Sequence, residues 1–270
     1  MEELLPIPTN EIIETPINFK RTITYKRSVV RIHVAEDFEA MSHAAADDFI
    51  EWVARIRRPL ICLPSGRSPV SFLKIIRGHY QRADALPDWY FVGLDEWVGI
   101  GEHEQGSCRR FFDDHLFRPL GVGDERISFF NGLSEDLAAE CRRTEKFIAD
   151  HGGIDISVLG IGTNGHLGLN EPGADREAFT QVSTLAPSTI EAAQDYFDRP
   201  RSVTRGITLG LSALLSSRHI LLLAGGSSKA DIIRKVVEDP VTPDVPGSWL
   251  QEHPSTRIYL DGEAAASLTQ

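Results

Sequence analysis

The feature that most constrains the fold of this chain is an alternation of short apolar runs with longer amphipathic segments. The runs at 59–63, 89–94 and 219–224 have the length of buried strands, and segments with helical periodicity separate them. Strands that alternate with helices favour right-handed crossovers and therefore parallel pairing. The sequence predicts an α/β fold with a mainly parallel sheet that helices cover on both faces.

The same alternation extends along most of the chain. Strands are predicted at 28–35, 59–63, 89–94, 127–130, 154–161, 219–224 and 256–260. Helices are predicted at 37–56, 70–77, 108–117, 134–150, 208–215 and 227–238. The less regular, polar stretch 172–204 is interpreted as a mobile, lid-like insertion. Residues 1–25 are expected to form an N-terminal arm, and residues 26–270 a single α/β domain.

Charge and hydropathy exclude several classes of partner. The net charge of −11 argues against binding to nucleic acid or to an anionic membrane, because both need an extended basic face. No apolar run approaches the roughly 18 residues of a membrane span. The acidic N-terminus lacks the apolar core of a secretory signal, so a cytoplasmic location is expected. A small phosphorylated ligand and a homo-oligomer are both compatible with this composition.

Neither the cysteines nor the histidines have the spacing of a metal site. Cys62, Cys108 and Cys141 fit neither a zinc site nor a disulfide framework, and we interpret them as reduced, mostly core thiols. His103 lies between Glu102 and Glu104, but acidic surface loops of this kind are usually solvated. We therefore expect no metal ligand in this chain.

Two glycine turns follow predicted strands and are candidates for binding an anion. Ligands of open parallel sheets bind just beyond the carboxyl ends of the strands. In the turn 64–69, Gly66 would allow close approach of the backbone and the next helix would offer its N-terminal amides, although many such turns bind nothing. In the turn 225–229, Lys229 lies where the helix dipole disfavours a cation. A phosphate would explain that lysine, and a plain surface lysine is the alternative.

An acid pair follows a third strand. Asp95 and Glu96 come directly after the run WYFVGL. A carboxylate at a strand end, partly shielded from water, is suited to act as a general base. A helix cap or a turn is the alternative for either acid.

A glycine-rich loop, 160–173, follows a fourth strand. It presents His166 and, five residues later, Glu171, a pair suited to proton transfer near neutral pH. The opening of the loop matches G-x-G-x-x-G, but Gly168, Pro172 and Gly173 disfavour the helix that a dinucleotide site requires. We therefore reject a dinucleotide site.

The segments LPSGRSP, FVGLDEWVG, DISVLGIGTNGHLGLNEPG and ITLGLSALLSSRHILLLAGGSSKA follow one another between about residues 30 and 262. In order and spacing they resemble the glucosamine-6-phosphate deaminase (isomerase) family, with GHxxxNEP as the most specific element. LDEWV, NGHLGLNEPG and VTRGITLGL resemble its galactosamine-6-phosphate branch in particular. The resemblance implies a modified Rossmann-like fold, no organic cofactor, and conversion of a 2-amino-2-deoxyhexose 6-phosphate to a ketose 6-phosphate and ammonia.

The resemblance also implies roles for individual residues. Asp95 would move the proton from C2 to C1, and His166 would assist ring opening with Glu171 as its carboxylate partner. The sugar phosphate would be held by the side chain of Lys229 and by the turn made of Ser65, Gly66, Arg67 and Ser68.

Three positions depart from the family pattern. Asn164, which we group with the catalytic residues, stands where many glucosamine enzymes have Asp. The phosphate-binding arginine of the family lid falls near Asp195, so Arg205, at the start of the next predicted helix, is proposed as its substitute and Arg67 as a second candidate. Only Arg176 represents the basic residues that follow NEP in allosterically activated members. We therefore expect no activation by an N-acetylated sugar phosphate.

Two other functions stay open at this point. A 6-phosphogluconolactonase would need His166 to activate water on a lactone, and Glu171 within NEP argues against it. A non-catalytic sugar-phosphate sensor would normally carry a DNA-binding module, and the short acidic N-terminus shows none. Whether the amino sugar has the gluco or the galacto configuration is not decided by these motifs.

Overall fold

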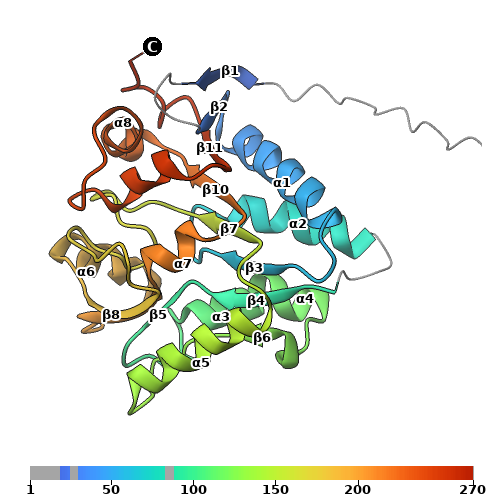
Figure 1. Cartoon of the computed structure of the whole chain (residues 1–270), viewed down its shortest axis with the longest axis vertical. Coiled ribbons are helices and arrows are strands. Elements are labelled where there is room, and N and C mark those ends of the chain that lie inside the picture. Colours follow the sequence, from blue (N-terminus) through green and yellow to red (C-terminus); the bar gives the residue numbers. More distant parts are fainter. Residues whose placement is uncertain (1–18, 25–29, 83–87, 270) are drawn as a thin grey trace, which may run out of the picture.

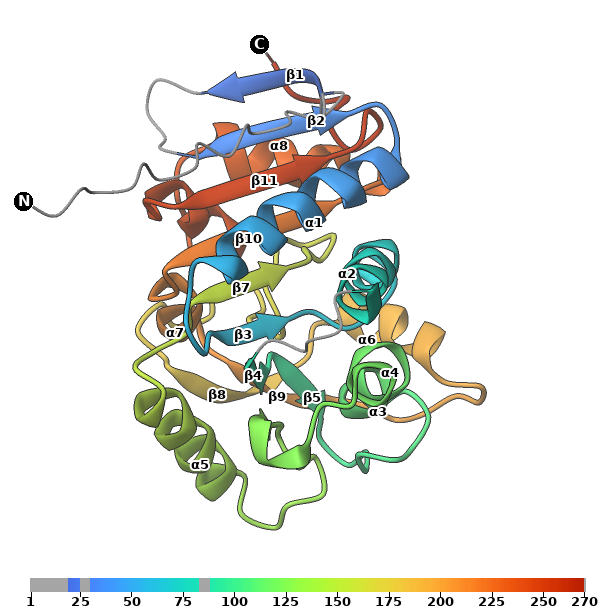
Figure 2. The same cartoon turned by 90° about the vertical axis from the view of Figure 1, so that its right-hand side faces the viewer.

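The computed structural model describes residues 19–24, 30–82 and 88–269, which form a main sheet of eight strands. The strand order is β1-β2-β11-β10-β7-β3-β4-β6, and Figure 2 shows it from β1 to β4. From β2 to β6 all neighbouring strands are parallel, and β1 is antiparallel to β2. The strands are β1 (Phe19–Thr24), β2 (Arg31–Ala35), β3 (Leu60–Leu63), β4 (Tyr90–Gly93), β6 (Ile127–Ser128), β7 (Ile156–Leu159), β10 (His219–Ala224) and β11 (Thr256–Leu260).

Helices cover both faces of this sheet (Figures 1 and 2). One face carries α1 (Phe38–Ala54), α2 (Val70–Arg82), α3 (Cys108–Phe112) and α4 (Arg118–Leu120), with a π-helical turn between the last two. The other face carries α5 (Leu137–Asp150), α7 (Leu211–Leu215) and α8 (Ala230–Glu238). Successive strand residues point to opposite faces, so Leu60 packs in one core cluster and Ile61 in the other. The predicted α/β fold is confirmed.

Side-chain caps explain where several of the predicted helices begin. Asp37 accepts a hydrogen bond from the Ala40 N–H at 2.8 Å at the start of α1, and Asp136 accepts one from the Ala139 N–H at 2.8 Å at the start of α5. Ser107 caps α3 in the same way. Each cap satisfies an amide that has no partner within its helix.

A second, three-stranded antiparallel sheet was not predicted. It consists of β5 (Asp95–Trp97), β9 (Arg205–Leu209) and β8 (Thr180–Thr184), in that order. The helix predicted over 208–215 is therefore wrong in its first residues, because only α7 at 211–215 is helical. Pairing on both sides of β9 provides hydrogen bonds that favour a strand there over the local helical pattern.

The predicted insertion 172–204 contains regular structure. It holds β8, helix α6 (Pro187–Ala193) and a 3₁₀ turn (Gln194–Tyr196). A small apolar cluster joins it to the rest of the molecule and is made of Trp97, Ile100, Leu169, Leu185, Ala193 and Val203. The segment covers one side of a cavity, as shown below, and its mobility stays a prediction.

The N-terminal arm and the cysteines can be compared with the structure only in part. Of the predicted arm 1–25, residues 19–24 form the edge strand β1, while residues 1–18 and 25 lie outside the described residues. All three cysteines are free thiols, with Cys62 and Cys108 buried and Cys141 half-buried, as predicted. No helix in the described ranges has both the length and the apolar character needed to cross a membrane.

Candidate active site

A cavity of about 550 Å³ lies at the carboxyl ends of the main-sheet strands. β3 and β7 are neighbours, with β4 and β6 on one side of the pair and β10 and β11 on the other. Parallel sheets open a ligand crevice where the strand order reverses in this way. The segments that follow β3, β4, β7 and β10 all reach the cavity, and α6 with its 3₁₀ turn covers it.

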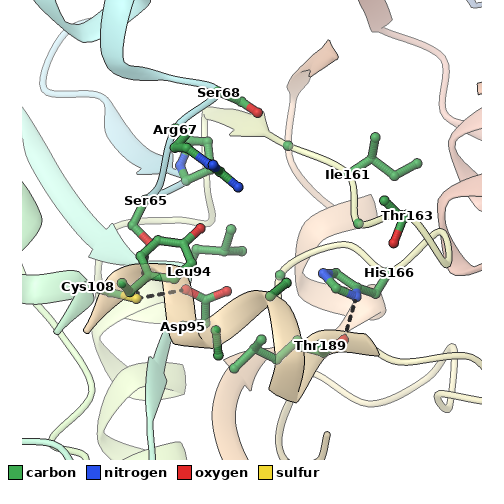
Figure 3. Close-up of a pocket in the computed structure, with 18 of the residues that line it drawn as sticks. Ser65, Arg67, Ser68, Leu94, Asp95, Cys108, Ile161, Thr163, His166 and Thr189 are labelled. Atoms are coloured by element: carbon green, nitrogen blue, oxygen red, sulfur yellow. Dashed lines mark hydrogen bonds between the residues drawn. The ribbon is translucent and has the colours of Figure 1, made fainter. Parts of the chain in front are cut away.

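Asp95, the first residue of β5, lies in the cavity wall (Figure 3). Its side chain is largely buried, and the Cys108 thiol donates a hydrogen bond to Oδ1 at 3.5 Å. Burial raises the pKa of Asp95 to about 6, although the Cys108 hydrogen bond and the charge of His166 act in the opposite direction. A carboxylate with such a pKa is a better proton acceptor than an ordinary aspartate and is still ionised at neutral pH.

Glu96 is also buried but does not line the cavity. Its carboxylate accepts hydrogen bonds from the Ser107 hydroxyl at 2.7 Å and from the backbone N–H groups of Trp97, Cys108 and Arg109 at 3.0 to 3.1 Å. Burial raises its pKa to about 7, while these hydrogen bonds act to lower it. Glu96 therefore has the role that was the alternative for either acid: its carboxylate caps the first turn of α3. Of the two acids, Asp95 alone faces the cavity.

His166 lies across the cavity from Asp95 (Figure 3). Its Nδ1 is 3.4 Å from Glu171 Oε2 and 3.3 Å from the Thr189 hydroxyl, which leaves Nε2 for a ligand. Asn164 braces the pair, because its Nδ2 donates to Glu171 Oε2 at 2.8 Å and its Oδ1 accepts from the His166 N–H at 3.2 Å. Asn164 and Glu171 thus lie behind His166 and do not line the cavity themselves.

The Glu171 carboxylate is held in its charged form. Its burial acts to raise the pKa, but hydrogen bonds from His166, Thr189 and Asn164 outweigh this and lower the pKa of Glu171 to about 2. An ionised carboxylate next to a histidine ring fixes the ring and stabilises its protonated form. The pair is therefore suited to shuttling a proton.

Glycines allow the loop to close tightly around His166. The Gly162 N–H donates to the His166 carbonyl at 3.1 Å, and a Cβ on Gly162 would lie 2.3 Å from Cε1 of the ring. Gly165 has φ of +90°, a conformation that other residues rarely adopt. The glycines of this segment therefore allow the loop backbone to pack against the His166 ring.

Basic side chains and hydroxyls gather at another part of the cavity. Ser65, Arg67 and Ser68 line it after β3, and Lys229 lines it after β10. Lys229 Nζ donates to the Ile161 carbonyl at 2.8 Å, and both its burial and the charge of Arg67 lower its pKa. A buried lysine whose charged form is weakened by a neighbouring cation is suited to binding an anion.

Gly66 does not line the cavity but shapes the turn. It has φ of +101°, and a Cβ at this position would lie only 2.4 Å from the Tyr196 hydroxyl. Only glycine combines that conformation with so close an approach to the covering segment. Within the described ranges, no group of three or more His, Cys, Asp or Glu side chains could hold a metal ion.

Comparison with known proteins agrees with this geometry. Residues 36–259 match the family of glucosamine-6-phosphate isomerases/6-phosphogluconolactonase. The chain belongs to this family. It is 39% identical over 232 residues to a glucosamine-6-phosphate deaminase of Geobacillus sp. (strain WCH70), covering 85% of this chain and 92% of that one. It is 36% identical over 245 residues to glucosamine-6-phosphate deaminase 2 of Bacillus subtilis (strain 168), covering 88% and 98%.

Solved structures of the family share the fold. A protein described as a monomeric glucosamine-6-phosphate deaminase superposes with a TM-score of 0.84 at 32% identity, covering 88% of this chain and 99% of its own. 6-Phosphogluconolactonase from Trypanosoma cruzi superposes with a TM-score of 0.71 at 20% identity, covering 92% and 99%. At that identity the second likeness concerns the fold alone.

One predicted phosphate ligand does not line the cavity. Arg205 is exposed, begins strand β9 and not a helix, and is not among the residues that line the cavity. Its carbonyl accepts from the Val98 N–H at 3.1 Å, which holds this backbone in the second sheet. The second candidate, Arg67, does line the cavity, and its guanidinium is 2.7 Å from Asp195 of the covering segment. The prediction for Arg205 is corrected accordingly.

Several cavity residues were missed from the sequence. Thr189 and Tyr196 come from the covering segment, and Cys108 comes from α3. None of the three follows a main-sheet strand, so the rule that ligands bind at strand ends did not select them. Ser228 does follow β10 within GGSSK and could have been found by that rule.

Proposed function

We propose that this chain catalyses the isomerisation and deamination of glucosamine 6-phosphate to a ketose 6-phosphate and ammonia. The observation that carries the proposal is the lining of one cavity: the buried Asp95 carboxylate, His166 opposite it with Glu171 behind the ring, and a basic part with Arg67 and Lys229. Relatives named glucosamine-6-phosphate deaminase favour the gluco substrate. The galacto substrate, indicated by motifs such as NGHLGLNEPG, is the second candidate.

The first step is the opening of the sugar ring. His166 Nε2 takes the proton of the C1 hydroxyl and delivers it to the ring oxygen, so that the C1–O5 bond breaks and the aldehyde forms. Glu171, ionised and 3.4 Å from Nδ1, stabilises the imidazolium that exists between the two transfers. The Asn164 amide holds the Glu171 carboxylate in place through a 2.8 Å hydrogen bond. An amide can therefore support the His166–Glu171 pair at a position where many members of the family have an acid.

The second step is the isomerisation. As Asp95 removes the proton from C2, the carbonyl oxygen O1 takes a proton from the C2 ammonium group, and an enolamine forms. Asp95 then returns its proton to C1, which leaves a protonated ketimine at C2. Water then adds to the ketimine carbon and ammonia leaves, so that a ketose 6-phosphate is formed. The shielded Asp95 carboxylate, with its pKa of about 6, is basic enough for this transfer and ionised at neutral pH.

The phosphate supplies the orientation. Ser65, Arg67, Ser68 and Lys229 would bind it, with the Gly66 turn offering backbone amides. Binding energy from this remote group holds C2 over Asp95, which is how a weak base can act on a poorly acidic C–H bond. No organic cofactor and no metal take part in these steps.

A lactone hydrolase is a poorer description of this site. It would use His166 to activate water, and a buried base on the opposite wall of the cavity would have no task. The Glu171 carboxylate, held ionised behind the histidine, matches a shuttle that must both accept and return a proton. The sensor alternative leaves both proton-transfer groups unexplained.

The test is a comparison of three substrates. Purified protein is offered glucosamine 6-phosphate, galactosamine 6-phosphate and 6-phosphogluconolactone, with ammonia release measured for the first two and hydrolysis for the third. We expect ammonia from glucosamine 6-phosphate at the highest kcat/KM. Lactone hydrolysis without ammonia release would refute the proposal, and a higher kcat/KM for galactosamine 6-phosphate would reassign the substrate.

Three further expectations accompany this function. We propose that residues 26–270 act as one α/β domain, that the protein works in the cytoplasm, and that an N-acetylated sugar phosphate does not activate it. Arg176 supports the last point, because it lies over the Trp249 ring at 4.9 Å and pairs with Glu177 at 2.8 Å. A rise in substrate affinity on adding such an effector would contradict it.

A further inference from the structure

A cysteine thiol lies directly beside the Asp95 carboxylate. Cys108 is the first residue of α3, is buried and lines the same cavity. Its Sγ donates to Asp95 Oδ1 at 3.5 Å, the contact drawn in Figure 3, and accepts from the Ser65 hydroxyl at 3.1 Å. The three side chains form a hydrogen-bonded chain that runs from the turn after β3 to the proposed base.

The position of the Cys108 thiol is fixed by Glu96, the residue that follows Asp95. Glu96 accepts hydrogen bonds from the Cys108 N–H at 3.1 Å and from the Ser107 hydroxyl at 2.7 Å. These bonds hold the first turn of α3 against β5, the strand that carries Asp95. Glu96 therefore sets the distance between the Cys108 thiol and the Asp95 carboxylate.

Asp95 has few other polar partners. Among the residues that the structure describes, Cys108 is the one side chain with a hydrogen bond to the Asp95 carboxylate. Burial raises the pKa of the Cys108 thiol well above its usual value, so the thiol keeps its proton and acts as a donor. A buried carboxylate that relies on one donor is sensitive to the strength of that bond.

We propose that Cys108 is a positioning residue that orients the Asp95 carboxylate and couples it, through Ser65, to the phosphate-binding turn. This inference rests on the proposed function, in which Asp95 is the base. While the Ser65 hydroxyl donates to Sγ, the thiol is polarised and is a stronger donor to Asp95. When a phosphate draws the Ser65 hydroxyl to itself, the bond to Asp95 weakens and the carboxylate becomes a stronger base. Substrate binding thus strengthens the base.

The pH profile of kcat/KM tests the first part of the proposal. Cys108→Ala removes the hydrogen-bond donor to Asp95, so the midpoint of the acid limb of the profile is expected to move to higher pH by about half a unit. Cys108→Ser keeps a donor, so its midpoint should stay near that of the wild type. The substrate's own titrations are common to all variants, so differences between variants report the enzyme. Cys141→Ala, which changes a thiol outside the cavity, is the matched control. A loss of activity at every pH with an unmoved limb would overturn the positioning role.

A double-mutant cycle tests the coupling. Ser65→Ala is expected to raise KM with or without Cys108, because the hydroxyl also faces the phosphate. Ser65→Ala should shift the acid limb only in protein that contains Cys108, because the thiol transmits the effect of the Ser65 hydroxyl to Asp95. An equal shift of the limb in the Cys108→Ala background would overturn the coupling.

A spectroscopic signal separates this inference from the proposed function. The infrared S–H stretching band of Cys108, identified by its loss in Cys108→Ser, should shift as Asp95 ionises and should not shift in Asp95→Asn. If Asp95→Asn keeps its turnover, the proposed function fails. If Asp95→Asn loses turnover, but the S–H band of the wild type does not shift over the pH range of the acid limb, only the role of Cys108 fails. The band is measured on the wild-type fold, so it decides the matter even if Cys108→Ala is unstable.

Discussion

The two ends of the cavity differ in how their charged groups are partnered. At the proton-transfer end, made of Asp95, His166 and Glu171, the acids are buried and hydrogen-bonded to protein groups. At the anion end, made of residues 65–68 and Lys229, the side chains line the cavity and have fewer and more exposed partners: Lys229 donates to a backbone carbonyl, Arg67 pairs with the exposed Asp195, and the Ser65 hydroxyl donates to Cys108. In the proposed function, the proton-transfer end is organised before the substrate arrives, and the anion end would be completed by the substrate's phosphate. Changes at the first end should therefore lower kcat, and changes at the second should raise KM.

The largest effect is expected from Asp95→Asn. The amide cannot accept the C2 proton, so kcat should fall by about 10²–10⁴, the usual contribution of a general base. KM should change little, because the phosphate contacts are intact. Ammonia release under saturating substrate measures this effect. A fall of less than roughly tenfold would remove Asp95 from its proposed role.

Glu171→Gln should have the next largest effect. It removes the charge that stabilises the protonated histidine but keeps the shape of the side chain, so kcat should fall by about 10²-fold. Glu177→Gln, at an exposed acid of the neighbouring loop, is the control and should leave kcat unchanged. Equal effects of the two changes would contradict the role of the His166–Glu171 pair.

At the anion end, Lys229→Gln should act on KM. Loss of a charge-assisted contact to phosphate is expected to raise KM by about 10 to 100-fold with a smaller change in kcat. Lys235→Gln, at an exposed lysine of α8, the helix that follows Lys229, provides the comparison. A pure loss of kcat in Lys229→Gln would break the division between the two ends.

Within the proton-transfer end, stability should depend on pH in opposite ways for the two acids. The pKa of Asp95 is raised from 3.8 to about 6, so its ionisation costs stability above pH 6 and that cost disappears as the pH falls towards 4. The pKa of Glu171 is lowered from 4.5 to about 2, so it contributes stability above pH 4.5 that is lost as the pH falls further. In urea unfolding at pH 8, Asp95→Asn should be more stable than the wild type by about 1–3 kcal/mol, and Glu171→Gln less stable. The gain in Asp95→Asn should vanish near pH 4, and a gain that persists there would contradict the assigned cause.

The smallest effect is expected from Arg205→Gln. The side chain is exposed and lies outside the cavity lining, so KM should change by less than about twofold. Arg67→Gln, made in parallel, should raise KM clearly more, because this arginine lines the cavity. A larger effect from Arg205 than from Arg67 would restore the role that the sequence pattern suggested.

Much of the site followed from local sequence patterns. Short apolar runs between amphipathic segments predicted the parallel sheet, and the residues just after those runs included Asp95, His166 and Lys229, which all line the cavity. This worked because side-chain periodicity is a local property and because the strands of a parallel sheet end at one edge. Asn164 was recognised as a departure, but its bracing of Glu171 was not.

What the sequence determined by itself was the fold class, the family and the strand ends at which the chemistry lies. Only the tertiary structure decided which of two adjacent acids faces the cavity, because that depends on how residues 95–97 pair with residues 206–208, far away in the chain. Successive residues of a strand point to opposite sides, so this pairing turns Asp95 towards the substrate and Glu96 towards α3. The same long-range pairing made 205–209 a strand and left Arg205 outside the cavity. Such contacts depend on register between distant segments, which no local pattern encodes.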